Sequence, residues 1–538
     1  MAVFSQFSLL VPSLALLSPL KTPKLDPSPA VMMEPVVGMP LLRPDINHDL
    51  ASVLQELERI LTKLPSLLTE RVPERRAYEP NSFFKTYYEP TLMRLAMESP
   101  FLELRQKCLD FLGSAGSVTP TQPIDPEAFS SASAFLPNFT LFSLQVSDPD
   151  IWPKRECLLR DIFLRTGRMP HYHLIMAYFP DYLEKHHDLL KTALTERGPL
   201  SEAWRFYLAF MAAATHKCEY LMKLTEDRCR MYGGASSWFD AESLDTVPEK
   251  LRLLGNLNLK LAHRPWELDA TDLQPLLLSF SVNELAQAVV ILALYHSLSS
   301  FVLGVGVMPE FDQPFTKLRK LSMTAAAECL YSNKPDIALR LMNLEEALRD
   351  VSESTNGEDS ELEEEEERDY CFEQLAGGAL SYVNYDVYTS RRKFYVSDFN
   401  WRDQGFELLE RMAPALARSV NGVIEHTYGM TSKTFGCHTN IETGPLRRAI
   451  WNYTQRVYGL LYDDYNYSEV NALLTKNTKT YIKKAACAPQ TVNYDDFNRI
   501  ELDISNEEKI HVVLLIAAGR MEGELLYWLH AMKTALGL

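Results

Sequence analysis

The sequence has no CxxC pair and no cysteine–histidine cluster with metal-ligand spacing. Its eight cysteines are scattered over 538 residues. This pattern is typical of thiols in a reducing compartment rather than of a disulfide framework. We therefore expect a protein with no metal and no cofactor.

An excess of positive charge is also missing, because the formal net charge is −17. This charge argues against a general nucleic-acid binder and against a basic membrane-surface protein. The most apolar stretch, residues 285–308, carries Gln287, His296 and three serines, and we interpret it as a buried helix rather than a membrane span. We expect no nucleic-acid partner, no membrane insertion and a cytoplasmic location, with nuclear residence left open.

Strand-like alternation is nearly absent, whereas helical periodicity covers most of the chain. We therefore predict an all-α fold. Helices are expected over 155–166, 172–194, 199–231, 246–261, 282–306 and 315–348, and again from about 402 to the C-terminus.

The first 150 residues contain two short helical patterns within proline-rich sequence. We expect a disordered leader over residues 1–45, a helix that stops at Pro65, and a second helix over 91–112 that Pro100 breaks or kinks. An acidic segment, EEALRDVSESTNGEDSELEEEEERD (345–369), is expected to be a solvated loop between two globular halves.

One cysteine, Cys218, lies among small and apolar residues of the predicted helix 199–231. Two interpretations are open. Most buried cysteines are inert small hydrophobes, whereas a peroxidatic thiol needs a lowered pKa and a proton donor. On an ideal helix Thr225 shares the face of Cys218, while His216 and Tyr220 lie on roughly the opposite face. That geometry gives the thiol no obvious base.

A double arginine begins another predicted helix. Pro445 suits the first helical position, so Arg447 and Arg448 fall in the first turn, where the helix dipole disfavours cations. Three threonines precede them: Thr431, Thr434 and Thr443. The residues alone favour a pair between Arg447 and a nearby acid such as Glu442, with the threonines capping and turning the chain.

Five segments of the chain resemble the sestrin family. They are HKCEYL (216–221), EKLRLLGNLNLKLAHRPW (249–266), YHSLSSFVLGVG (295–306), PLRRAIWNYTQRVYGLLYDDYNYSEVNALL (445–474) and EKIHVVLLIAAGRM (508–521). The resemblance implies two halves similar to the alkylhydroperoxidase AhpD fold, joined by a helical linker. It also implies a stress-inducible regulator that restrains the TOR kinase complex by binding the GATOR complex.

On this resemblance the chain divides into five parts. They are an N-terminal extension (1–150), part of an N-terminal AhpD-like domain (151–245), the linker with the remaining core helices (246–344), the acidic loop (345–380) and a C-terminal AhpD-like domain (381–538).

The resemblance also implies a peroxidase motif, in which a cysteine is followed by a tyrosine two residues later and a histidine seven residues later. This chain keeps Cys218 and Tyr220 but has Thr225 in place of the histidine. A threonine hydroxyl cannot titrate near neutral pH as an imidazole does. A thiol-dependent hydroperoxide reductase that uses Cys218 is therefore the alternative function, not the leading one.

Some sestrins sense leucine, and the resemblance places that pocket at the double arginine. It implies that Arg447 holds the ligand carboxylate, that Glu508 holds the ammonium group, and that Thr431, Thr434 and Thr443 close over the ligand. A bidentate guanidinium and an opposing carboxylate suit a zwitterion.

The family's apolar pocket floor is a tryptophan seven residues before the glutamate, and this chain has Glu501 there, between Ile500 and Leu502. Loss of the indole weakens leucine binding or favours another amino acid, unless Ile500 or Leu502 refills the space.

Two aspartates, Asp463 and Asp464, lie side by side in YDDYNY (462–467). Spacing alone favours an acidic turn. The resemblance implies instead that the pair contacts GATOR, with the neighbouring tyrosines as interface anchors. The leading expectation is thus a TOR regulator that binds GATOR and is gated by leucine or another amino acid.

Overall fold

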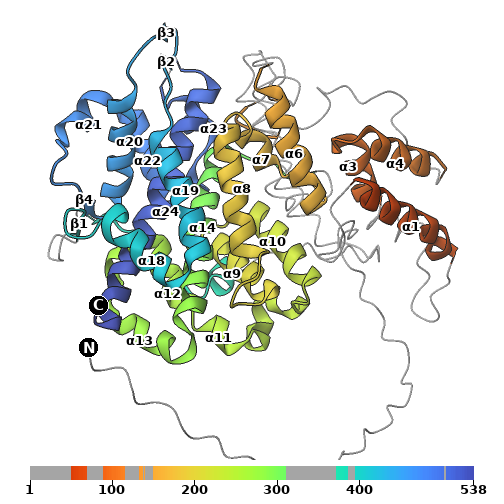
Figure 1. The fold of residues 1–538 in the computed structure, drawn as a ribbon, viewed down its shortest axis with the longest axis horizontal. Coiled ribbons are helices and arrows are strands. Elements are labelled where there is room, and N and C mark those ends of the chain that lie inside the picture. Colours follow the sequence, from red (N-terminus) through yellow and green to blue (C-terminus); the bar gives the residue numbers. More distant parts are fainter. Residues whose placement is uncertain are drawn as a thin grey trace, which may run out of the picture. The chain divides into compact units, whose positions relative to one another are not determined.

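The computed structural model describes residues 50–69, 89–114, 132–136, 139, 150–310, 371–385, 394–501 and 504–538. Their regular secondary structure is helical apart from four two-residue strands and one isolated β-bridge, which confirms the predicted all-α fold (Figure 1). All of them belong to one unit of the chain, Val37–Leu538.

The helices up to the acidic segment are α1 (Leu50–Thr69), α3 (Glu89–Glu98), α4 (Leu102–Ser114), α6 (Trp152–Thr166), α7 (His171–Met176), α8 (Pro180–Leu194), α9 (Glu202–Thr215), α10 (Glu219–Met231), η3 (Ser236–Phe239), η4 (Ala241–Thr246), α11 (Glu249–Arg252), α12 (Gly255–His263), η5 (Pro265–Glu267), α13 (Ala270–Ser279) and α14 (Val282–Gly304).

The later elements are α17 (Phe372–Leu375), β1 (Phe394–Tyr395), η8 (Trp401–Gly405), α18 (Phe406–Met412), α19 (Pro414–Gly429), β2 (Thr434–Phe435), β3 (His438–Thr439), α20 (Gly444–Val457), β4 (Leu460–Leu461), α21 (Ser468–Leu473), α22 (Lys476–Cys487), η9 (Pro489–Thr491), α23 (Tyr494–Asn498) and α24 (Asn506–Leu536). Strands β1 and β4 pair in parallel, whereas β2 and β3 form an antiparallel hairpin.

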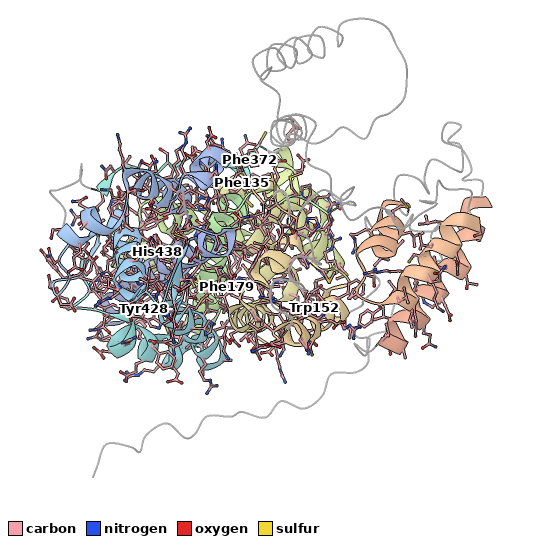
Figure 2. All side chains as sticks on the ribbon, turned by 90° about the horizontal axis from the view of Figure 1, so that it is seen from above. Phe135, Trp152, Phe179, Phe372, Tyr428 and His438 are labelled. Atoms are coloured by element: carbon pink, nitrogen blue, oxygen red, sulfur yellow. The ribbon has the colours of Figure 1, made fainter. Side chains whose placement is uncertain are left out.

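Two long helices, α14 and α24, form the centre of the core. Every residue of α14 from Leu285 onward is buried, as expected for a helix that is apolar on all sides. Side chains fill the space between the helices (Figure 2), and the Ser297 hydroxyl of α14 donates to the Ala517 carbonyl of α24 at 2.8 Å. Among the described residues, α14 is the one helix long and apolar enough to cross a membrane, and its apolar window is wholly buried within the protein.

A buried ionic network also joins the two long helices. The Arg520 guanidinium donates to Glu524 Oε1 at 2.8 Å and approaches His216 Nε2 at 2.6 Å. The other Glu524 oxygen lies 2.7 Å from His296 Nδ1, and His296 Nε2 lies 2.9 Å from the Asn258 amide oxygen. The network therefore links α24 to α14, α12 and the end of α9.

The predicted helix 199–231 is in fact two helices. Lys217 has φ = 53°, and backbone bonds run from Lys217 N to Ala214 O at 3.0 Å and from Cys218 N to Ala213 O at 3.0 Å. These two bonds form a Schellman motif, which ends α9. The break had no signal in the sequence, because lysine occupies the left-handed position where glycine is usual.

The region around the acidic segment differs in part from the expectation. Residues 345–370 and the predicted helix 315–348 lie outside the described residues. The last residues assigned to the loop instead form α17 and pack closely on α12, where a Cβ on Gly377 would lie 2.5 Å from the Gly255 Cα. Gly377 has φ = 94°, so glycine is required there for backbone conformation as well as for space.

The N-terminal extension contains helices where they were predicted, but their ends differ. Helix α1 continues through Pro65 to Thr69, so the predicted stop is wrong. The chain does break near Pro100, between α3 and α4. Residues 1–49 lie outside the described residues, and the division into two AhpD-like halves stays a prediction.

Candidate amino-acid pocket and partner-binding loop

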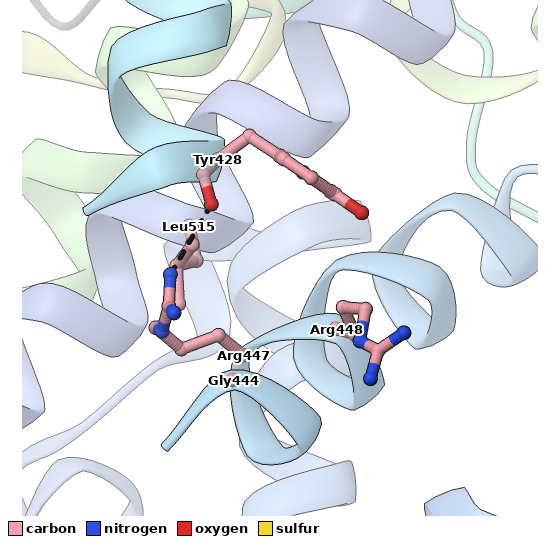
Figure 3. A pocket seen from close by; sticks show the side chains of 5 residues that line it. All are labelled: Tyr428, Gly444, Arg447, Arg448 and Leu515. Atoms are coloured by element: carbon pink, nitrogen blue, oxygen red, sulfur yellow. Dashed lines mark hydrogen bonds between the residues drawn. The ribbon is translucent and has the colours of Figure 1, made fainter. Parts of the chain in front are cut away.

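Three helices meet around a cavity of about 130 Å³. The C-terminus of α19 supplies Tyr428, the N-terminal turns of α20 supply Gly444, Arg447 and Arg448, and α24 supplies Leu515 (Figure 3). A cavity of roughly 150 Å³ holds a benzene molecule. The volume therefore suits a small organic group such as an amino-acid side chain.

Arg447 is the central polar group of this cavity. Its guanidinium donates to the Tyr428 carbonyl oxygen at 3.2 Å, whereas its buried Nε has no hydrogen-bond partner among the described residues (Figure 3). Burial lowers the pKa of Arg447, and the charge of Glu442 acts in the opposite direction. In the described part of the chain the two residues form no ion pair. The guanidinium therefore keeps donor capacity for a ligand.

Glu508 lies in the first turn of α24, where it completes a capping box. Its Oε2 accepts from Ser505 N at 2.7 Å, and Ser505 Oγ accepts from Glu508 N at 3.2 Å. Both carboxylate oxygens also lie 3.1 Å from Gly436 N at the tip of the β2–β3 hairpin. Gly436 has φ = 59°, which suits the first central position of a type II′ hairpin turn. Glu508 thus ties the hairpin to the start of α24.

The three predicted threonines are near this junction but differ in their roles. Thr443 is buried, and its hydroxyl donates to the Ser432 carbonyl at 2.6 Å. Thr434 lies in β2 with its hydroxyl 3.1 Å from Ser432 Oγ. Thr431 is exposed just after α19. Only Thr443 is therefore fixed as part of the framework, whereas Thr431 and Thr434 are on the exposed edge of the hairpin segment.

Ile500, the one described neighbour of Glu501 that was expected to refill the pocket floor, is not among the residues that line the cavity. Ile500 is fully buried, and its carbonyl accepts from the Thr478 hydroxyl, which also donates to Glu501 at 2.7 Å. Leu502 lies outside the described residues. The apolar wall seen in the cavity is supplied by Leu515 instead.

Asp463 and Asp464 are both exposed, in the turn that follows β4. Asp463 accepts a hydrogen bond from the Ser397 hydroxyl. Behind them Tyr465 and Tyr467 pack edge to face with ring centroids 5.2 Å apart, and Arg456 lies 4.9 Å from the Tyr467 ring centroid. The turn therefore exposes two carboxylates next to a pair of packed tyrosine rings.

The site around Cys218 is closed to solvent. Cys218 is fully buried at the start of α10, and the Thr225 hydroxyl lies 2.7 Å from the Leu221 carbonyl and 3.0 Å from the Met222 carbonyl. The prediction of which residues share a helix face with Cys218 assumed one continuous ideal helix. That assumption does not hold, because the chain breaks at Lys217 between α9 and α10. The Tyr220 hydroxyl donates to Glu310 at 2.7 Å, and burial together with Glu310 raises its pKa well above the usual value. Neither Tyr220 nor Thr225 is thus poised to deliver a proton.

The comparison with known proteins decides the family. The family model described as PA26 p53-induced protein (sestrin) matches residues 143–376 and 377–535. The chain belongs to the sestrin family. The match spans both the cavity at Arg447 and the turn at Asp463 and Asp464.

Curated sestrins are similar over most of their length. The chain is 34% identical to human Sestrin-2 over 409 residues, which cover 69% of this chain and 85% of that protein. It is 31% identical to Sestrin-1 of Xenopus laevis over 444 residues, covering 74% and 90%. It is 29% identical to the sestrin homolog of Dictyostelium discoideum over 510 residues, covering 83% and 82%.

The structure of this sestrin adds site residues that the sequence reasoning missed. His511 is buried beside the pocket, and its pKa falls to about 4 because of burial and the charge of Arg447, while Glu508 acts to raise it. The charges of Arg447 and Glu508, the two residues predicted to hold the ligand, therefore both act on His511. Glu508, His511 and Leu515 have the spacing i, i+3, i+7, which places them on one face of α24. That spacing was the signal available in the sequence.

No metal-binding group emerges from the geometry. Within the described ranges, no set of three or more histidine, cysteine, aspartate or glutamate side chains is arranged to hold a metal ion.

Proposed function

We propose that this sestrin is a negative regulator of TOR kinase signalling that binds the GATOR complex, and that an amino acid in the Arg447 pocket sets the strength of that binding. The observation that carries the proposal is the half-buried side chain of Arg447, which lines a cavity and whose Nε is buried without a partner among the described residues. A buried donor without a partner costs about 1–3 kcal/mol, so a ligand carboxylate at this position is stabilising.

The chemistry of the pocket suits an α-amino acid. Arg447 supplies a cation for the carboxylate. We assign the ammonium group to Glu508, which is not among the residues that line the cavity but whose charge acts on His511 together with that of Arg447. His511, with its pKa at about 4, is neutral at physiological pH. It therefore adds no third charge to those of Arg447 and Glu508. Leu515 provides an apolar contact for the side chain. We propose a ligand with an aliphatic side chain of about leucine's size.

A continuous set of contacts runs from the pocket to the aspartate turn. The Tyr428 ring packs edge to face on Trp451 with centroids 5.4 Å apart. The Trp451 side chain hydrogen-bonds Glu522, which accepts from Gln455 at 2.8 Å. Gln455 in turn accepts a hydrogen bond from the Tyr462 hydroxyl, next to Asp463. A ligand that moves Tyr428 thereby has a physical route to the partner surface.

The turn at Asp463 and Asp464 is the surface proposed to meet GATOR. Exposed carboxylates at an interface rim mainly determine which partner binds and how fast, whereas neighbouring aromatic rings supply contact area. The hydroperoxide reductase alternative has no comparable support, because its thiol is fully buried.

The double variant Asp463→Ala/Asp464→Ala is expected to weaken binding of purified GATOR complex at least tenfold without changing thermal stability. The measurement is an immobilised-GATOR binding titration on the full chain. The matched control is Glu407→Ala/Asp495→Ala, which also removes two exposed charges, each held in a solvent-exposed i,i+4 ion pair. Binding of the aspartate variant at the control's affinity would contradict the partner assignment.

A further inference from the structure

A second and larger hollow lies beside α22, apart from the amino-acid pocket and the aspartate turn. Its volume is about 430 Å³, which falls within the usual range of roughly 300–1,000 Å³ for ligand pockets. Four lysines of α22 contribute to its lining, together with two tyrosines from other segments. The lining consists of Tyr382, Tyr453, Lys476, Lys479, Thr480, Lys483, Lys484, Cys487 and Ala488.

The lysines are placed against the local electrostatics of their helix. Lys476 lies in the first turn of α22, which contains no acidic residue, so the helix dipole opposes its charge. Lys476, Lys479 and Lys483 are spaced i, i+3, i+7 and share one face. Like charges at such spacings destabilise a helix. A chain with net charge −17 has thus gathered cations where its own fold does not favour them.

Most of these charges are not neutralised by the protein. Lys484 forms an ion pair with Asp496 at 2.8 Å. Lys479 donates to the neutral side chain of Asn471 at 2.8 Å, and the Lys483 ammonium lies 5.9 Å from the Tyr382 ring centroid. Across the described ranges, Lys476, Lys479 and Lys483 have no carboxylate within ion-pair distance. A solvated helix face explains exposed lysines, but not their convergence on a hollow.

The tyrosines give this hollow an aromatic side. The Tyr382 hydroxyl donates to the Val457 carbonyl at 3.0 Å, which holds the ring in place. Both Tyr382 and Tyr453 are half-buried, so their rings are partly accessible. An aromatic base that stacks on such a ring is stabilised, and lysine ammonium groups are established binders of phosphate.

We propose that the α22 hollow binds a nucleotide, with the phosphates on Lys476, Lys479 and Lys483 and the base against Tyr382 and Tyr453. Only a ligand with both phosphates and an aromatic base uses all of these side chains. Phosphate alone leaves the tyrosine rings unused, and a nucleoside alone leaves the lysine charges uncompensated.

The test is isothermal titration of the full chain with ATP, sodium tripolyphosphate and adenosine at 0.15 M salt, the last two probing each half of the site separately. The expected result is saturable 1:1 binding of ATP, at least fivefold weaker binding of tripolyphosphate and no detectable binding of adenosine. The triple variant Lys476→Gln/Lys479→Gln/Lys483→Gln is expected to weaken ATP binding at least tenfold.

The control variant is Lys154→Gln/Lys185→Gln/Lys223→Gln, which changes the net charge equally on α6, α8 and α10 and is expected to bind ATP like the wild type. Equal affinity for ATP and tripolyphosphate would overturn the nucleotide assignment. No binding of either ligand, or equal losses in the two triple variants, would overturn the site itself.

Discussion

Replacement of Arg520 by methionine is expected to lower the free energy of unfolding by roughly 3–5 kcal/mol. The guanidinium is fully buried and hydrogen-bonds Glu524, Ser300 and two backbone carbonyls. Its removal leaves the Glu524 carboxylate in the core with His296 as its one remaining side-chain partner among the described residues, and burial holds the pKa of His296 below its ordinary value. The charge of Glu524 is then largely uncompensated. The measurement is urea denaturation at pH 7.5.

A double-mutant cycle separates the buried charge from lost packing. Arg520→Met/Glu524→Met removes both charges, so it is expected to be more stable than Arg520→Met alone. Arg411→Met, in an exposed pair with Glu407, is the surface control and is expected to change stability by less than about 1 kcal/mol. An Arg520→Met protein as stable as this control would show that the network contributes nothing to the core.

Stability is expected to fall steeply as the pH drops from about 6.5 to 5. His173, His186 and His187 form a cluster with ring centroids 5.8 and 6.1 Å apart. Burial lowers the pKa of all three, to about 3 for His186 and well below the usual value for His173. Below pH 6.5 the unfolded chain binds protons that the folded chain does not, so stability present above that pH is lost on acidification.

Each such histidine contributes up to about 1.4 kcal/mol per pH unit below 6.5. Glu522 acts in the opposite sense, because burial raises its pKa to about 7 and its contribution to stability is lost as the pH rises. Urea titrations at pH 7.5, 6.0 and 5.0 measure the slope. His186→Phe is expected to reduce it, whereas substitution of the exposed His438 by phenylalanine is expected to leave it unchanged. A flat profile above pH 5 in the wild type would contradict the prediction.

The fold could be predicted wherever the signal was local. The apolar stretch at 285–308 and the break near Pro100 follow from residues within a few positions of each other. The end of α9 could not be predicted, since Lys217 adopts a left-handed conformation that its residue type does not favour. Helix α1 likewise continues past Pro65 although proline usually ends a helix.

The position of the pocket could be predicted in part, because Arg447 places a positive charge at the start of a helix, where the helix dipole disfavours it. The residues around Arg447 could not be predicted, because Tyr428, Leu515 and His511 come from elements that only the tertiary fold brings together. The role of Glu508 in fixing the hairpin at Gly436 depends on a contact across 72 residues of sequence. The α22 hollow could not be predicted from the sequence for the same reason, since Tyr382 lies far from the lysines along the chain.

The central claim is that the Arg447 pocket holds an amino acid, and calorimetric titration of the full chain with each of the twenty amino acids tests it most directly. We expect saturable binding of leucine or a similarly sized aliphatic amino acid. Arg447→Ala is expected to weaken this binding at least about thirtyfold, because it leaves the ligand carboxylate desolvated without its partner. Arg418→Ala, an exposed arginine on α19, is the matched control and is expected to bind like the wild type. The absence of heat from all twenty titrations, or equal binding by Arg447→Ala and the control, would contradict the account.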